Sequence, residues 1–263
     1  MSDGARRTQR DPPSQGGGAA ILRGIGVSKS FGGLAAVRGV DFAVRRGEIF
    51  GVIGPNGAGK TTLFRLISGI YRPDAGSLLL DETDIAGLKP HRICRMGVCT
   101  THQLVRPFGE LSVMENVLVG ALFGRGKRAR QTGGREAARE ILGFMGLDRL
   151  TDAPARSLTL AQRKRLEVAR ALATAPTVLL LDEVMAGLNP AETAATMDLI
   201  RAIRGRGITV FIVEHVMRAI MGLCDRVMVL HHGEKLAEGT PREVVDDERV
   251  VTAYPGTWRA SNP

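Results

Sequence analysis

The sequence has 263 residues, of which 44% are hydrophobic, and its formal net charge is +9. This length and composition predict one large domain with a substantial core, and because no apolar run approaches the thickness of a bilayer, we expect a soluble protein. The three cysteines, Cys94, Cys99 and Cys224, form neither a disulfide framework nor a metal-ligand cluster, which indicates reduced thiols in the cytosol.

The N-terminal segment, residues 1–18, is rich in Arg, Pro, Gly and Ser and has no apolar stretch, so we expect a disordered tail and no secretory signal. Strands are expected over Ala20–Val27 and Leu34–Val44, with a turn at residues 28–33 between them. Phe31 in this turn lies a short loop upstream of the next strand, where its ring could stack on a nucleobase. Packing in the core is the ordinary alternative for a single aromatic ring.

A phosphate-binding loop is predicted between a buried strand, Ile49–Ile53, and a helix with apolar residues at helical spacing. The loop fits the pattern G-x-x-x-x-G-K-[ST], and its residues, with the threonine that follows, are Gly54, Pro55, Asn56, Gly57, Ala58, Gly59, Lys60, Thr61 and Thr62. The glycines let main-chain N–H groups face the α- and β-phosphates at the positive end of the helix dipole. Lys60 would reach the β- and γ-phosphates, and the Thr61 hydroxyl would bind Mg²⁺. A glycine-rich turn before an ordinary helix is the alternative, and the complete match in this context favours nucleotide binding.

Two short strands are expected next, over Ser77–Leu80 and Gly97–Thr101, the second ending at Gln103. Gln103 stands at the junction with a segment of different character. We expect it to contact Mg²⁺ and to couple movement of that segment to the nucleotide state.

Residues 104–157 show no strand pattern and carry helical periodicity at Val113–Leu122 and Arg135–Phe144, which predicts an inserted helical lobe. Part of the excess positive charge lies between these helices, at residues 125–135. A basic protein is a candidate for binding nucleic acid or an anionic membrane surface. Because aromatic residues are missing from the basic stretch, we interpret it as a solvated loop.

Two later segments, Val178–Leu181 and Ile208–Val213, are apolar at every position, as strands covered on both faces must be. Val227–Leu230 and Lys235–Ala237 are typical of a closing hairpin. Strands that alternate with helices around a phosphate-binding loop predict an α/β fold. We expect a P-loop NTPase (RecA-like) core with a mostly parallel sheet, an antiparallel β edge region and the inserted helical lobe.

Asp182 and Glu183 follow directly on the buried strand. The carboxyl ends of strands in an open α/β sheet line the ligand crevice, where the phosphate-binding loop also emerges. We therefore expect Asp182 to hold Mg²⁺ and Glu183 to polarise the attacking water as a general base. A solvated strand end is the alternative, and the intact loop argues against it.

His215 ends the next apolar strand at the same edge, after Glu214. An imidazole there could hydrogen-bond the γ-phosphate and the attacking water. Since a lone histidine at a strand end is normally structural, this role depends on the resemblance described below.

Thr159 and Gln162 are spaced as a capping box, which opens a helix with Leu166 and Ala169 on one face. This structural role explains the pattern completely. A capped N-terminus is also an anion site, and the Thr159 hydroxyl can donate to phosphate.

The order and spacing of these motifs from Ala20 to Gly256 resemble those of ABC-transporter ATPase subunits. The resemblance implies that Phe31 stacks on adenine and that Thr159, Ala161 and Gln162 contact the ATP of a partner subunit. It also implies that Asn189 lies in a loop at the dimer interface. The implied divisions are a tail (1–18), a core (19–103 and 158–245), a helical lobe (104–157) and a C-terminal extension (246–263).

Within that family, four stretches resemble the branched-chain (hydrophobic) amino-acid uptake subfamily: Glu115–Val117, Arg163–Ala173, Val184–Pro190 and Ala253–Gly256. ATPases of lipopolysaccharide export share much of the same pattern. The resemblance implies an ATPase that uses ATP and Mg²⁺ at the cytoplasmic face of the plasma membrane. The implied partners are transmembrane permease subunits, a second ATPase subunit and, indirectly, a solute-binding protein.

The signature stretch departs from the usual Leu-Ser-Gly-Gly-Gln, because Leu160 and Ala161 replace both glycines. Their added Cβ atoms hinder close approach to a phosphate. Two alternatives follow: a cassette that binds ATP and barely hydrolyses it, or a heterodimer with unequal sites. A soluble ABC ATPase acting on ribosomes or DNA is a further alternative, which the single cassette argues against, so no nucleic-acid partner is expected.

Overall fold

The computed structural model describes residues 19–101, 107–125 and 134–253. Its strands form two sheets, one of six strands and one of four. The six-stranded sheet has the spatial order β10 (Glu234–Gly239), β9 (Arg226–His231), β3 (Ile49–Ile53), β8 (Thr209–Val213), β7 (Val178–Asp182) and β6 (Val98–Thr100). All pairs in it are parallel except β10 with β9. The predicted α/β fold with a mostly parallel sheet is therefore confirmed.

The four-stranded antiparallel sheet is ordered β2 (Leu34–Arg45), β1 (Ala20–Phe31), β4 (Ala75–Leu80) and β5 (Thr83–Asp84). The predicted turn at 28–33 is wrong in extent, because β1 continues to Phe31 and pairs there with Leu34. Cross-strand pairing and Asp74 hold this end of β1 extended. The Asp74 carboxylate accepts hydrogen bonds from the main-chain N–H of Ser30 (2.7 Å) and from Lys29 (2.6 Å). These partners are distant in the sequence, so local composition did not predict them.

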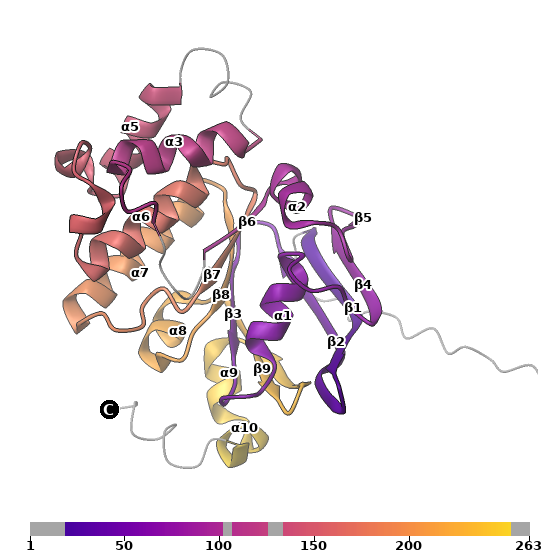
Figure 1. Cartoon of the computed structure of the whole chain (residues 1–263). Helices are drawn as coiled ribbons and strands as arrows, with labels where there is room; N and C mark the ends of the chain where they lie inside the picture. The colour runs from indigo at the N-terminus through magenta and orange to yellow at the C-terminus, as the bar shows by residue number, and fades with distance from the viewer. Residues whose placement is uncertain (1–18, 102–106, 126–133, 254–263) are drawn as a thin grey trace, which may run out of the picture.

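Helices cover both faces of the six-stranded sheet, as Figure 1 shows. On one side lie α3 (Val113–Phe123), α5 (Gly134–Phe144), α6 (Leu160–Leu172), α7 (Pro190–Gly205) and α8 (Met217–Leu223). On the other side, α1 (Lys60–Ile67) lies between this sheet and the antiparallel one, with α2 (Pro90–Met96) beside it. The chain also forms α9 (Pro241–Asp246), α10 (Glu248–Ala253) and two 3₁₀ turns at Asp148–Leu150 and Ala155–Ser157.

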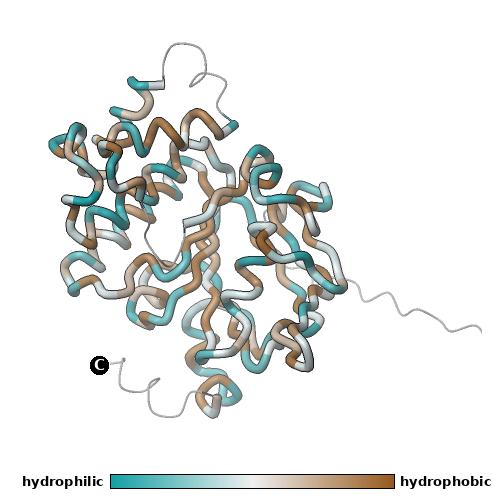
Figure 2. The backbone as a smooth tube through the Cα atoms, viewed as in Figure 1, coloured by the Kyte–Doolittle hydropathy of each residue, from teal (hydrophilic) through white to brown (hydrophobic). Residues whose placement is uncertain are grey.

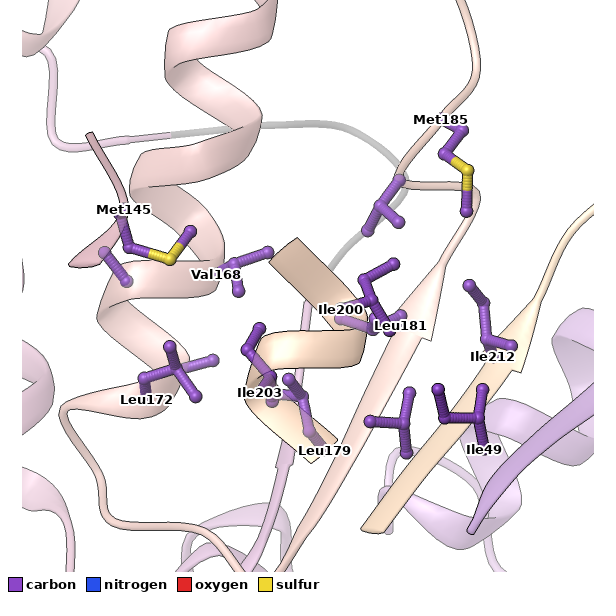
Figure 3. Close-up of a cluster of buried hydrophobic side chains, with 14 of the residues drawn as sticks. Ile49, Met145, Val168, Leu172, Leu179, Leu181, Met185, Ile200, Ile203 and Ile212 are labelled. Atoms are coloured by element: carbon purple, nitrogen blue, oxygen red, sulfur yellow. The ribbon is translucent and has the colours of Figure 1, made fainter. Parts of the chain in front are cut away.

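The central strands are buried at every position, which explains why their sequences are apolar throughout rather than alternating. Figure 2 shows the hydrophobic colour concentrated along these strands. Ile49 of β3, Leu181 of β7 and Ile212 of β8 pack with Ile200 and Ile203 of α7 in one buried cluster (Figure 3). The rigid sheet thereby fixes the positions at which its strands end and the functional loops begin.

The two predicted lobe helices are present, and α3 and α5 share the same buried cluster with α6. Gly120 of α3 lies so close to α6 that an added Cβ would meet the carbonyl oxygen of Arg170. The division of the chain into core, lobe and extension stays a prediction. Within the described residues, no helix combines the length and the apolar character needed to cross a bilayer.

Candidate nucleotide-binding site

The predicted phosphate-binding loop lies between β3 and α1, as the sequence indicated. Gly59 is the N-cap of α1 with a φ of 102°, and Gly57 has a φ of 79°, both in the region that favours glycine. A Cβ on Gly59 would meet the carbonyl oxygen of Ala36 on β2, and one on Gly54 would meet that of Leu230 on β9. The loop is thus packed tightly against its neighbours.

Lys60 opens α1 and is only 8% exposed. Its Nζ donates to the carbonyl oxygens of Gly54 (2.6 Å) and Pro55 (3.1 Å) and so closes the loop on itself. Burial lowers the pKa of Lys60, while the charges of Glu183 and Asp182 raise it. The lysine and the predicted acid pair therefore lie within electrostatic reach of each other.

Asp182 is the last residue of β7 and is 6% exposed. Burial, with the nearby charge of Glu183, raises its pKa to about 6, against the opposing charges of Arg65 and Lys60. Its main-chain N–H donates to the hydroxyl of Thr101 (3.3 Å). A buried carboxyl group of this kind is stabilised in its ionised form by a cation.

The oxygen-bearing side chains near the end of β7 fit Mg²⁺. This ion takes oxygen ligands and usually binds through one or two protein groups plus substrate phosphates. Asp182 supplies a carboxylate, and Thr61 in the first turn of α1 supplies a hydroxyl. Among the residues that the structure describes, no group of three His, Cys, Asp or Glu side chains could hold a metal alone. This arrangement suits an ion that arrives with a phosphate ligand.

Glu183 follows Asp182 and adopts a left-handed backbone conformation, with a φ of 49°. Its N–H donates to the carbonyl oxygen of Val213 (2.9 Å), and its carbonyl oxygen accepts from the Nζ of Lys164 (3.0 Å). These two hydrogen bonds hold the main chain on both sides of the Glu183 Cα. The Glu183 side chain, 21% exposed, lies with its Oε1 3.9 Å from the Nδ1 of His215.

The parallel register of β7 and β8 explains this proximity, because Asp182 pairs with Val213, two residues before His215. The structure thus brings together Lys60, Asp182, Glu183 and His215, as predicted. Their catalytic and metal-binding roles stay predictions.

Two buried charged residues at this site were missed by sequence reasoning. Glu214 is 1% exposed, and its Oε1 accepts from the main-chain N–H of Met185 (2.8 Å), while burial raises its pKa. Its Oε2 has no hydrogen-bond partner among the described residues. Lys164 is 8% exposed and donates to the carbonyl of Ala186 (2.6 Å) as well as to Glu183. Position after an apolar strand was a signal for Glu214, whereas nothing local distinguishes Lys164 from the basic residues beside it.

Phe31 is 43% exposed at the end of β1. Its ring meets that of Tyr71 edge to face, with 5.1 Å between the ring centroids, and the Lys29 ammonium lies 5.5 Å from its centroid. One side of the ring is therefore accessible, unlike that of a core residue. Stacking on a base remains a prediction.

The capping box at the start of α6 is confirmed. The Thr159 hydroxyl accepts from the main-chain N–H of Gln162 (3.3 Å), and the Gln162 Oε1 accepts from that of Thr159 (2.9 Å). Leu160 is 46% exposed, and Ala161 is half-buried. Asn189 caps α7 in the same way, accepting from the main-chain N–H of Glu192 (2.9 Å).

Gln103 lies outside the described residues, as do most of the basic stretch and the end of the last subfamily stretch. Their predicted roles therefore stay predictions.

Residues 37–186 match the model of a protein family described as "ABC transporter". The chain belongs to the ABC transporter family. A second family model, "Branched-chain amino acid ATP-binding cassette transporter", matches residues 234–254 of this ABC cassette. The resemblance noted in the sequence motifs is thus confirmed.

Several curated ABC proteins are similar along almost their whole length. The high-affinity branched-chain amino acid transport ATP-binding protein LivG of Salmonella typhimurium is 40% identical over 249 residues, covering 90% of this chain and 98% of LivG. BraF of Pseudomonas aeruginosa, of the same description, is 39% identical with the same coverage. The lipopolysaccharide export system ATP-binding protein LptB of Acidithiobacillus ferridurans is also 39% identical, covering 90% of this chain and 97% of LptB.

Solved structures of ABC cassettes share the fold. A nucleotide-free ATP-binding cassette from an ABC transporter superposes with a TM-score of 0.83 at 31% identity, covering 90% of this chain and 100% of that one. An ATP-binding cassette in its ADP conformation gives the same TM-score and identity over 90% of this chain and 99% of that one. As an ABC cassette, this chain is a nucleotide-binding protein. That the loop around Lys60 holds the phosphates stays a prediction.

Proposed function

We propose that this chain hydrolyses ATP and thereby powers a membrane importer of branched-chain or other hydrophobic amino acids. The observation that supports ATP hydrolysis most directly is the position of Lys60. It lies close enough to Asp182 and Glu183, at the edge of the parallel sheet, for their charges to raise its pKa. The match of residues 234–254 to the branched-chain cassette model favours the substrate class. The names of LivG and BraF, which describe such transport, support it.

In this proposal, main-chain N–H groups of residues 56–59 and the Nζ of Lys60 hold the phosphates, and Phe31 stacks on adenine. Phosphate oxygens replace the carbonyls of Gly54 and Pro55 as acceptors for Lys60. Thr61, Asp182 and Gln103 would hold Mg²⁺, which would neutralise charge on the phosphates.

Glu183 accepts the proton of the attacking water as a general base. Because Val213 and Lys164 hydrogen-bond its main chain, the backbone from which the Glu183 carboxylate extends is held in place. His215, 3.9 Å from that carboxylate, donates to the γ-phosphate and orients the water. Because chemistry of this kind depends mostly on position, the strained backbone at Glu183 suits the role.

Hydrolysis in this proposal needs a second ATPase subunit. Thr159, Ala161 and Gln162 contact the ATP held by the partner, and Asn189 lies at the interface. Leu160 and Ala161 add Cβ atoms where glycines would admit a phosphate closely, which favours two unequal sites and a partner of different sequence. Permease subunits bind the pair at the cytoplasmic face of the plasma membrane, and a solute-binding protein delivers the amino acid to them.

Uptake of labelled leucine into proteoliposomes tests this proposal directly. The vesicles contain the chain with a candidate ATPase partner and a candidate permease, with solute-binding protein outside and ATP inside. We expect ATP-dependent uptake that Glu183→Gln abolishes, whereas Glu140→Gln on the exposed face of α5 leaves it unchanged. Uptake that persists in Glu183→Gln would contradict the assignment of the base.

A second candidate function, lipopolysaccharide export, is favoured by the 39% identity to LptB. The same vesicles distinguish the two functions, because an export ATPase would be stimulated by a lipopolysaccharide permease and not by amino acid with its binding protein. Stimulation by ribosomes or DNA in place of either would contradict both.

A further inference from the structure

Two thiols lie side by side outside the nucleotide site. Cys94 is in the last turn of α2, and Cys99 is on β6. Gly97 ends the helix with a φ of 108° and reverses the chain, so that β6 returns alongside α2. The two cysteines line the same pocket, and each shifts the pKa of the other.

The pair is more accessible than the third cysteine of the chain. Cys94 and Cys99 are each partly exposed, whereas the third cysteine, Cys224, is buried. The pair lines a pocket of about 240 Å³, whose other walls include Ser68, His91 and Leu180. A pocket of this size has room for a small reagent beside the two cysteines.

The surroundings make the two thiols unequal. Hydrogen bonds from the Cys99 thiol and the Thr174 hydroxyl, with the charge of Arg95, lower the pKa of Cys94 to about 7. The neighbouring Cys94 thiol and, after it, burial raise the pKa of Cys99. Burial also raises the pKa of Cys224. Since the thiolate is the reactive form, Cys94 is the nucleophile of the three at neutral pH and Cys99 is its nearest thiol partner.

We propose that Cys94 and Cys99 form an oxidation site for hydrogen peroxide, in which Cys94 is oxidised first and Cys99 then closes an intramolecular disulfide. The Cys94 thiolate attacks one peroxide oxygen, the O–O bond breaks, and the departing hydroxide takes a proton to become water. The sulfur of Cys99 then attacks that of the Cys94 sulfenic acid, the S–O bond breaks, and a second water leaves with the Cys99 proton. Two electrons pass from the thiols to the peroxide, which is reduced to two waters.

Peptide mapping of the full chain tests this without any assay of ATP hydrolysis, so it can fail independently of the proposed function. Trypsin cleaves after Arg95, between the two cysteines, so a disulfide joins two tryptic peptides that reduction separates. After treatment with equimolar hydrogen peroxide, we expect an intact mass lower by about 2 Da and the peptide Ile93–Arg95 linked to the peptide that carries Cys99.

Three variants assign the steps. Cys94→Ser should show no mass loss, and Cys99→Ser should accumulate a sulfenic acid on Cys94 that dimedone traps. Cys224→Ser should behave as the wild type. The rate of alkylation by iodoacetamide at Cys94 should rise with a midpoint near pH 7, as the pKa of about 7 requires.

An unchanged mass, linkage through Cys224, or oxidation of Cys94 that stops short of the disulfide in the wild type would each overturn the proposal. The wild-type map decides these outcomes, so they do not depend on whether a variant folds.

Discussion

The ammonium group of Lys164 on α6 donates a hydrogen bond to the carbonyl oxygen of Glu183 at 3.0 Å. It also donates to the carbonyl of Ala186 at 2.6 Å. The helix that starts with the capping box at Thr159 is thereby attached to the loop that carries the proposed general base. A left-handed conformation at Glu183 costs on the order of 1 kcal/mol, and such conformations persist where the surroundings hold them.

We expect Lys164→Met to lower kcat for ATP hydrolysis roughly tenfold with little change in KM, because a displaced base affects the chemical step more than nucleotide binding. Lys164→Arg, which keeps donors at this position, should restore most of the rate. Steady-state kinetics and thermal unfolding of both variants separate positioning from loss of fold. Lys89→Met, at an exposed lysine, is the control; an equal loss of kcat in the Met and Arg variants would contradict the positioning role.

Removal of Lys60 should abolish tight nucleotide binding. Lys60→Ala deletes the charge that would meet the β- and γ-phosphates and also opens the bonds to Gly54 and Pro55. We expect the Kd for ATP to rise at least about 100-fold, as for the loss of a charge-assisted contact of about 3 kcal/mol. Fluorescence titration with a labelled ATP analogue measures it, and an unchanged Kd would refute the phosphate site.

The buried carboxyl of Asp182 should make stability and Mg²⁺ binding depend on pH in opposite directions. Its pKa is raised to about 6 from 3.8, so the folded state holds its proton more tightly than the unfolded state. Its contribution to stability is complete below the unfolded pKa and is lost as pH rises through about 6. The ionised form that Mg²⁺ needs appears over the same interval.

Asp182→Asn should therefore stabilise the nucleotide-free protein at pH 7.5 by on the order of 2 kcal/mol and leave it nearly unchanged at pH 4. The same substitution should weaken Mg²⁺-dependent ATP binding at pH 7.5. Chemical denaturation at the two pH values gives the difference. Asp198→Asn, at a side chain that is 76% exposed, serves as the control, and an equal effect of both variants would contradict the assignment.

The contact between α3 and α6 predicts opposite effects for two glycines. In Gly120→Ala the new Cβ would meet the Arg170 carbonyl and lie 3.2 Å from the Cβ of Ala173, so we expect a loss of about 1–3 kcal/mol in the free energy of unfolding. In Gly143→Ala on α5, where the described part of the chain leaves open space, we expect a gain of about 0.5–1 kcal/mol. Denaturant unfolding of the pair tests this, and a neutral Gly120→Ala would show that the helices do not pack this closely.

Local patterns predicted the parts of the fold that local physics determines. The phosphate-binding loop, the apolar run of β7 and the capping box at Thr159 each depend on residues close together in the chain, and each is present as predicted. The end of β1 near Phe31 was predicted as a turn because its pairing with β2 and its contacts with Asp74 come from elsewhere. The predicted convergence of the acid pair on Lys60 succeeded because parallel strands end at one edge.

The burial and the hydrogen-bond partners of Lys164 and Glu214 could not be predicted in the same way. Lys164 occupies a helix position where a lysine ordinarily faces solvent, and only the approach of the loop at 183–186 buries it. Glu214 can be buried because the main-chain N–H of Met185, in the loop after β7, donates to its carboxylate. Each depends on the packing of two segments whose proximity the sequence does not encode locally.

The two carbonyl partners of Lys60 affect how the site behaves between turnovers. When a nucleotide departs, the ammonium group does not face an empty, dehydrated space, because Gly54 and Pro55 offer it replacement acceptors. In the proposed cycle, loss and rebinding of the nucleotide would exchange one set of oxygen acceptors for another around the Lys60 ammonium group. The lysine would therefore keep an oxygen acceptor whether or not a nucleotide is bound.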